Sequence, residues 1–386
     1  MRELDIDDYD GRLQAFIKHK LLATYLPELI YRVGRKWEGI SYVDGFAGPW
    51  GSNDPDHRDT SFGLAVDLLA EHRRGLQEEH GDDFLPRALL IERDPRAFAK
   101  LEEFAERRNR PDFPVTAAKG ELEDNLQLIQ KFLAEGGEKS FRFILLDPKG
   151  WNGLGLNKIA PILRDRSCEV LVNVMSRHIV RFIEQGDRAD SYEKFFGSRE
   201  SLDLIKGTPP KLRRDAAVHE YCKSLKRLGG FRYVAQCVVL RPETDEVLYH
   251  LVFGTNHPRG VEVFKQAELA AMKLQEDVRR QHKRETREQR TGQTELSLGG
   301  TSSLVLDLRE RYLGQAMMAV NRLVRTHTEI SYEQVFCEFM AFPMVSKKDL
   351  DSHLELSDDF ELHLVQEGAR KPNVEREDQV SWKGCP

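Results

Sequence analysis

The chain has 386 residues, which is enough for one large α/β domain and a second, smaller domain. Hydrophobic residues make up 40% and charged residues 32%, as in globular proteins, and a net charge of −6 excludes a protein that binds nucleic acid over its whole surface. No apolar run is long enough to span a bilayer and the N-terminus is too acidic for a signal peptide, so we expect no membrane contact and a cytoplasmic location.

The first predicted element is a helix over residues 12–33, where apolar residues recur at helical spacing. Lys18, His19 and Lys20 interrupt this pattern, and they face either a ligand or solvent. The next strand ends in Tyr-Val-Asp-Gly-Phe-Ala-Gly-Pro at residues 42–49. An apolar strand that runs into Gly-x-x-Gly before a helix brings the backbone close to an adenosine-type cofactor in open α/β sheets, although such a turn also occurs in plain loops.

Two further apolar runs end in an acid. The apolar run within residues 87–94 ends at Glu92, and the run within residues 141–148 ends at Asp147. A carboxylate that closes the second strand of a nucleotide-binding sheet accepts hydrogen bonds from ribose hydroxyls. Each acid alone is also explained as a solubilising surface residue. Because parallel strands bind ligands at their carboxyl ends, the three strand ends together predict a site at one edge of one sheet.

The residues that follow the first and third predicted strands extend this prediction. The loop at residues 49–60 is a lid or a plain surface loop, and Thr60 or Ser61 caps a helix over 62–74. After a short strand, Glu121 or Glu123 could accept a hydrogen bond from the exocyclic amine of adenine, or could simply favour the helix that follows through its dipole.

The spacing of apolar residues predicts the remaining helices and strands. Helices are expected at 96–107, 124–135, 156–163, 178–196 and 216–228, and strands at 113–118, 169–174, 231–240 and 246–255. The last two strands are separated by only five residues, so they should form an antiparallel hairpin. We therefore predict an α/β fold with a doubly wound, mostly parallel seven-stranded sheet and a terminal hairpin. This is the order of the class I S-adenosylmethionine-dependent methyltransferase sheet.

The C-terminal part is mainly helical. We assign residues 1–260 to a methyltransferase-like domain, 261–303 to a charged helix and linker, and 304–386 to a winged-helix-like module. Helices near 304–326, 331–341 and 346–354 and a two-stranded wing within 360–382 support the last assignment, although a helical dimerisation cap would give a similar pattern.

Four segments carry a resemblance to a known family. They are residues 42–49, Ile-Glu-Arg-Asp-Pro at 91–95, Leu-Asp-Pro-Lys-Gly-Trp at 146–151 and Leu-Val-Phe-Gly-Thr-Asn-His-Pro-Arg-Gly at 251–260. Together they resemble the three-Cys-motif partner family. The resemblance implies a class I methyltransferase fold, S-adenosylmethionine as cofactor, and a separate partner protein that carries the cysteines. The five cysteines of this chain are dispersed and offer no metal-ligand spacing. This agrees with a Cys motif that lies in the partner protein and not in this chain.

The resemblance also implies roles for particular residues. Asp44, Gly45 and Gly48 would border the methionine and ribose portions of the cofactor, Glu92 would hold the ribose hydroxyls, and Asp147 would lie where the methyl group is presented. The complete predicted cofactor set is Asp44, Gly45, Phe46, Ala47, Gly48, Glu92, Arg93 and Glu121. This chain departs from the family pattern at Trp50 and at Thr60-Ser61-Phe62, which puts the lid geometry in doubt but not the fold. It also has Lys149 where an aromatic residue commonly precedes the glycine of the Asp-Pro segment.

The segment Asp-Pro-Lys-Gly-Trp resembles the Asp/Asn-Pro-Pro-aromatic motif of amino-methylating enzymes. There the acid and a proline-held carbonyl accept the protons of an exocyclic amine while the aromatic ring stacks on a flipped base. Asp147, Pro148 and Trp151 are therefore the predicted catalytic residues, although Gly150 displaces the aromatic by one position.

Three functions compete on these grounds. The leading hypothesis is an S-adenosylmethionine-dependent methyltransferase that modifies an amino group of a DNA or RNA base together with a Cys-bearing partner. The second is a non-catalytic accessory protein that keeps the cofactor pocket. The third is a metal-dependent nuclease or hydrolase, for which the sequence offers no compact Asp/Glu cluster at metal-ligand spacing, so no metal site is predicted.

Overall fold

A computed structural model provides the fold. It describes residues 4, 6–9, 12–48, 51–52, 54–80, 84–150, 153–185, 189–241, 243–291, 303–327 and 329–383. None of the helices in these ranges combines the length and the apolar character needed to cross a bilayer.

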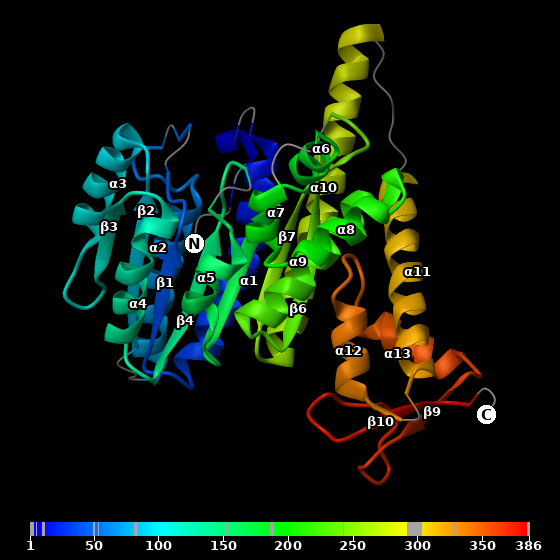
Figure 1. The fold of residues 1–386 in the computed structure, drawn as a ribbon. Coiled ribbons are helices and arrows are strands. Elements are labelled where there is room, and N and C mark those ends of the chain that lie inside the picture. The colour runs from blue at the N-terminus through cyan, green and yellow to red at the C-terminus, as the bar shows by residue number, and fades with distance from the viewer. Residues whose placement is uncertain are drawn as a thin grey trace.

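The main sheet has seven strands in the order β3-β2-β1-β4-β5-β7-β6 (Figure 1). The strands are β1 (Gly39–Asp44), β2 (Leu85–Glu92), β3 (Val115–Lys119), β4 (Ser140–Leu146), β5 (Cys168–Val174), β6 (Tyr233–Leu240) and β7 (Val247–Thr255). The first five strands pair in parallel, and β7 pairs antiparallel with both β5 and β6. The predicted fold class, including the terminal hairpin, is confirmed.

Helices cover both faces of this sheet. The face that includes Tyr42 of β1 is covered by α1 (Leu13–Gly34), α2 (Ser61–His80), α3 (Pro95–Arg108) and α10 (Pro258–Thr291). The opposite face is covered by α4 (Leu126–Glu135), α5 (Leu156–Leu163), α6 (Ser176–Gln185), α7 (Ala189–Phe196), α8 (Arg199–Gly207) and α9 (Arg213–Gly229). Both faces of the central strands are therefore buried, which is why these strands read as continuous apolar runs in the sequence.

The prediction of one helix over residues 178–196 is wrong, because the structure divides this segment into α6 and α7. The prediction also missed α8. Gly197, at φ +69°, follows α7, and the side chain of Ser198 then accepts a hydrogen bond from the backbone N–H of Glu200 to cap the new helix. Leu202 and Ile205 bury its apolar face. The cap and this short apolar stripe were visible in the sequence but cover only nine residues.

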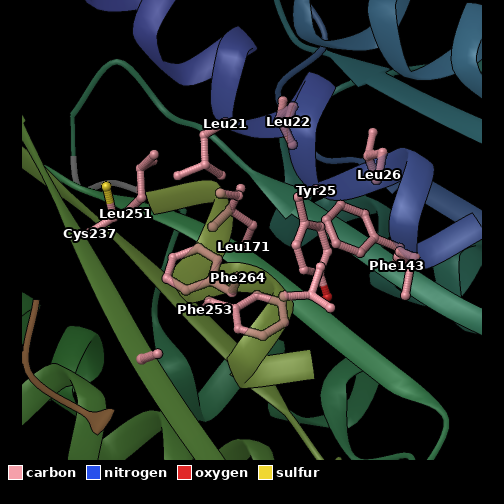
Figure 2. Packing of buried hydrophobic residues seen from close by; sticks show 14 of the residues in the cluster. Leu21, Leu22, Tyr25, Leu26, Phe143, Leu171, Cys237, Leu251, Phe253 and Phe264 are labelled. Atoms are coloured by element: carbon pink, nitrogen blue, oxygen red, sulfur yellow. The ribbon is translucent and has the colours of Figure 1, made fainter. Parts of the chain in front are cut away.

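The core under α1 is rich in aromatic rings (Figure 2). Tyr25 of α1 packs against Phe253 of β7 with ring centroids 5.1 Å apart, and Phe253 stacks on Phe264 of α10 at 4.7 Å. The Tyr25 hydroxyl donates to the carboxylate of Glu169, and Thr255 donates to its other oxygen at 2.7 Å. Complete burial raises the pKa of Glu169 to about 7.

Glu169 should make stability depend on pH. Its folded-state pKa lies above the ordinary value of 4.5, so the folded chain binds the proton more tightly and loses stability as the pH rises through about 7. We expect the free energy of unfolding of Glu169→Gln, relative to wild type, to increase by about 3 kcal/mol between pH 4.5 and pH 8. Urea unfolding across this range measures the difference, and a difference that does not change with pH would contradict the assignment.

The C-terminal part forms a second unit. It contains α11 (Ser303–Arg325), β8 (Ile330–Ser331), α12 (Tyr332–Met340), α13 (Lys347–Leu356), β9 (Phe360–His363) and β10 (Gln379–Trp382). The three strands form an antiparallel sheet in the order β8-β10-β9. The three predicted helices and the pair of strands are present, whereas the winged-helix assignment and the domain boundaries stay predictions. Most of the predicted linker lies outside the described residues.

A buried ion pair joins this unit to the sheet. Lys265 and Glu268 of α10 lie 2.9 Å apart, and their side chains are 3% and 1% exposed. Lys265 also donates to the carbonyl oxygens of Gln236 in β6 and Phe342 after α12. Glu268 accepts from the backbone N–H of Met344 at 2.7 Å. These contacts fix the loop after α12 against α10 and β6.

Removal of one partner should therefore destabilise the protein, because an unpaired charge would stay buried. We expect Lys265→Met to lower the free energy of unfolding by about 3 kcal/mol or more. The matched control is Lys131→Met, which breaks an exposed pair with Glu135 and should change stability by less than about 0.5 kcal/mol. Equal effects of the two substitutions in chemical denaturation would show that the buried pair has no special role.

Candidate functional site

A cavity of about 200 Å³ lies where β1, β2, β3 and β4 end. It is lined by seven of the predicted site residues, namely Gly45, Phe46, Glu92, Arg93, Glu121, Asp147 and Pro148. A larger cavity of about 690 Å³ lies between α2 and α3, but no strand end lines it and its charges pair with one another, as Arg108 does with Asp67. The smaller cavity is therefore the candidate site, since it lies at the carboxyl edge of parallel strands.

The turn after β1 depends on Asp44. Its carboxylate is fully buried and accepts hydrogen bonds from the Phe46 N–H at 3.0 Å, the Ser61 hydroxyl at 2.9 Å and the Tyr42 hydroxyl at 3.3 Å. Burial raises the pKa of Asp44 to about 6. Asp44 therefore ties the turn to the start of α2. It does not line the cavity, so a direct contact with the methionine portion of a cofactor would require the turn to open.

Gly45 brings the backbone close to the cavity wall. A Cβ atom at this position would lie 2.9 Å from side-chain carbons of both Leu122 and Leu146, which is too close for carbon atoms. Ala47 is fully buried, and its N–H donates to the carbonyl of Ile91 at 2.7 Å. Ala47 and Gly48 shape the turn but do not line the cavity.

The acid that ends β2 lies in the cavity wall. Glu92 is 3% exposed, and its carboxylate accepts a hydrogen bond from the Asp94 N–H at 2.7 Å. Burial raises its pKa, while this bond opposes the shift. Arg93 and Glu121 form an ion pair at 3.0 Å on the rim, where both side chains are largely exposed. Their pairing is therefore weak and easily rearranged.

Asp147 is held by two residues from other elements. Lys18 of α1 forms an ion pair with its Oδ2, and Asn173 at the end of β5 donates to its Oδ1 at 2.8 Å. Lys18 is only 9% exposed. Lys18 was one of three residues predicted to face either a ligand or solvent, and its partner was not predicted. The burial of Lys18 could have been found, because Lys18 lies on the same helical stripe as Leu22 and Tyr25, but this stripe does not identify its partner.

Three predictions fall on residues that the structure does not place. Trp151, the predicted stacking residue, and Pro49 and Trp50 in the possible lid lie outside the described residues. The predicted cap is observed, because the Thr60 hydroxyl accepts from the Gly63 N–H at 3.1 Å. The lid function stays a prediction. Across the described part of the chain, no three His, Cys, Asp or Glu side chains come together in a way that could hold a metal ion.

Comparison with known proteins adds little. No family model and no curated protein matches the chain, so membership of the three-Cys-motif partner family stays a prediction. Among solved structures, the O-methyltransferase from Bacillus cereus in complex with SAH aligns at 15% identity and a TM-score of 0.30. The alignment covers 61% of this chain and 80% of that chain. This likeness is too distant to carry an argument, so the fold class rests on the strand order.

The contact between Lys18 and Asp147 can be tested directly. Lys18→Met would leave a mostly buried carboxylate without its cation, so we expect a loss of about 2 kcal/mol in the free energy of unfolding. The control is Lys20→Met on the same helix, whose side chain makes no contact of this kind with a described residue. If thermal or urea unfolding showed the same stability for both variants, the ion pair would not be important for the fold.

Proposed function

We propose that this chain is an S-adenosylmethionine-dependent methyltransferase. The proposal rests on one observation: in a sheet of order β3-β2-β1-β4-β5-β7-β6, a cavity at the carboxyl ends of four strands combines a glycine turn, a buried acid and Asp147. Open α/β sheets bind nucleoside cofactors at this edge. The cofactor would supply a methyl group on a positively charged sulfur, and three of the five charged residues that line the cavity are acids.

The residues present fit a nucleoside cofactor in part. Glu92 could accept two hydrogen bonds from ribose hydroxyls, and the backbone at Gly45 allows a close approach. At about 200 Å³ the cavity is smaller than the usual 300–1,000 Å³ of ligand pockets, so a whole cofactor requires the rim to move. The exposed Arg93–Glu121 pair is the part of the rim that can move at little cost.

For the acceptor we propose an amino group of a DNA or RNA base. A carboxylate has about four acceptor positions, so Asp147 can still accept from an amine while it is held by Lys18 and Asn173. The carbonyl of Pro148 would accept the second proton, and Trp151 would stack on the base. Lys18 and Asn173 then serve as positioning residues, since they fix the carboxylate through contacts with its two oxygens. The predicted Cys-bearing partner remains part of this proposal.

One observation favours the second candidate, a non-catalytic protein that binds the cofactor. Both oxygens of Asp147 already have partners within the protein, as expected for a carboxylate that has a structural role. Under this alternative, Asp147 would stabilise the contact between α1 and the sheet, and no methyl transfer would take place.

Calorimetric titration with S-adenosylmethionine tests the pocket. We expect wild type to bind and Glu92→Gln to bind at least tenfold more weakly, because a hydrogen bond to a charged group contributes about 1.5–3 kcal/mol. The control Glu102→Gln alters an exposed acid on α3 and should leave binding unchanged. Absence of binding in wild type would refute both candidates.

Transfer of isotope label from the cofactor to DNA or RNA, with and without the partner protein, separates the two candidates. Transfer by wild type and its loss in Asp147→Ala would support the enzyme. Cofactor binding without transfer to any nucleic acid would favour the accessory protein.

A further inference from the structure

A second hollow, of about 360 Å³, lies between α6, α9, α11 and the turn that joins β6 to β7. β7 is antiparallel to both of its neighbours, so β6 runs parallel to β5, and both strands end at the edge that carries the candidate site. The β6–β7 turn and the start of α6 therefore lie at that same edge. In Figure 1, α6 lies at the upper end of the sheet, where α10 continues beyond it.

Three basic residues and three acidic residues line the hollow itself, and further basic side chains lie next to these acids. Three carboxylates line it, and each lies close to two basic side chains. These groups are Glu246 with Arg177 and Arg241, Asp245 with Arg279 and Lys283, and Asp215 with Arg214 and Arg311. The pKa of Asp215 is raised, chiefly by burial, and the guanidinium groups of Arg311 and Arg214 oppose that shift. Among these nine groups, three positive charges have no matching negative charge.

Two further cations increase this excess. Lys211 lines the hollow, and Arg181 lies next to the lining residue Val180 on α6. Both side chains are exposed, and neither forms an ion pair with a described residue. On α6, Arg177, His178 and Arg181 are exposed, and the helix contains one acid, Glu184. Within the part of the chain that the structure describes, Lys211 and Arg181 can therefore contact an anionic partner without the loss of an ion pair.

The turn that carries two of the acids is held rigidly. Arg279 of α10 is 4% exposed at its side chain and donates to the carbonyl oxygens of Arg241 and Thr244 as well as to Asp245. Lys283 adds a second contact to Asp245 at 3.0 Å. A surface whose shape is fixed before binding loses less conformational entropy when a ligand binds.

We propose that the hollow and the exposed side of α6, together called the basic face, bind the phosphate backbone of a single-stranded nucleic acid. The basic face comprises Arg177, His178, Arg181, Lys211, Arg214 and Arg311. This inference rests on the proposed function, and it identifies the surface that holds the acceptor strand. Lysine and arginine bind phosphates through charge and release counterions. A flexible strand can also place phosphates in a recess and present an unstacked base at the same edge of the sheet.

The test measures fluorescence anisotropy of a labelled 20-nucleotide strand, DNA and RNA in turn, at several salt concentrations. The variant Arg181→Glu/Lys211→Glu should bind at least tenfold more weakly than wild type at about 100 mM salt. The slope of log affinity against log salt should also fall in magnitude by about two. Thermal unfolding confirms that the variant is folded.

The control is Lys131→Glu/Lys139→Glu, which makes the same charge change at two exposed lysines, one on α4 and one just before β4 at the opposite edge. It should change affinity by less than about threefold. Failure of wild type to bind either strand, or equal losses in both double variants, would overturn the proposal. So would binding only to phosphatidylserine vesicles. Calorimetry with S-adenosylmethionine on the same variants shows separately whether the cofactor site works.

Discussion

The packing of α1 against the sheet is the contact on which the rest of the structure depends. Its buried stripe places Tyr25 among Phe143, Phe253 and Phe264, side chains that come from β4, β7 and α10. Each fully buried side chain of this kind contributes about 1.5–3 kcal/mol relative to exposure. Because these partners come from both halves of the chain, α1 sets the position of the terminal hairpin relative to the parallel strands.

The same helix reaches the candidate site. Lys18 lies two turns before Tyr25 and forms the ion pair with Asp147, so the apolar packing that fixes Tyr25 also fixes a cation beside the acid at the end of β4. The carboxylate cannot rotate freely, since Asn173 holds its other oxygen. Fixed anionic groups are more effective than mobile ones in binding and catalysis, because no reorganisation is required when the ligand arrives. In this way the stability of the core and the geometry of the site have a common origin.

Sequence reasoning predicted most of the fold and the part of the site that is local in sequence. Apolar runs that end at Glu92 and Asp147, and a hairpin connection too short for a crossover helix, are patterns that each lie within one short stretch of the chain. The burial of Asp44 was not predictable, because it depends on a hydroxyl from Ser61 across a loop. The partner of Lys18 is 129 residues away, and no period or motif indicates such a pair. The basic face was missed for the same reason, since it combines α6, α9, the hairpin turn and α11.

The distribution of charge connects the two surfaces. Three acids and two basic residues line the candidate cavity, and Lys18 pairs with Asp147, so this cavity offers no excess of cations to a phosphate backbone. The chain as a whole carries a net charge of −6, so a polyanion gains nothing from the overall field. Binding of a nucleic acid therefore requires a local excess of cations that acts within the screening length of about 8–10 Å. At the same edge of the sheet as the cavity, each of the three acids of the hollow lies close to two basic side chains. If the proposed strand is held there by its phosphates, only one base, which carries no charge, has to enter the candidate cavity.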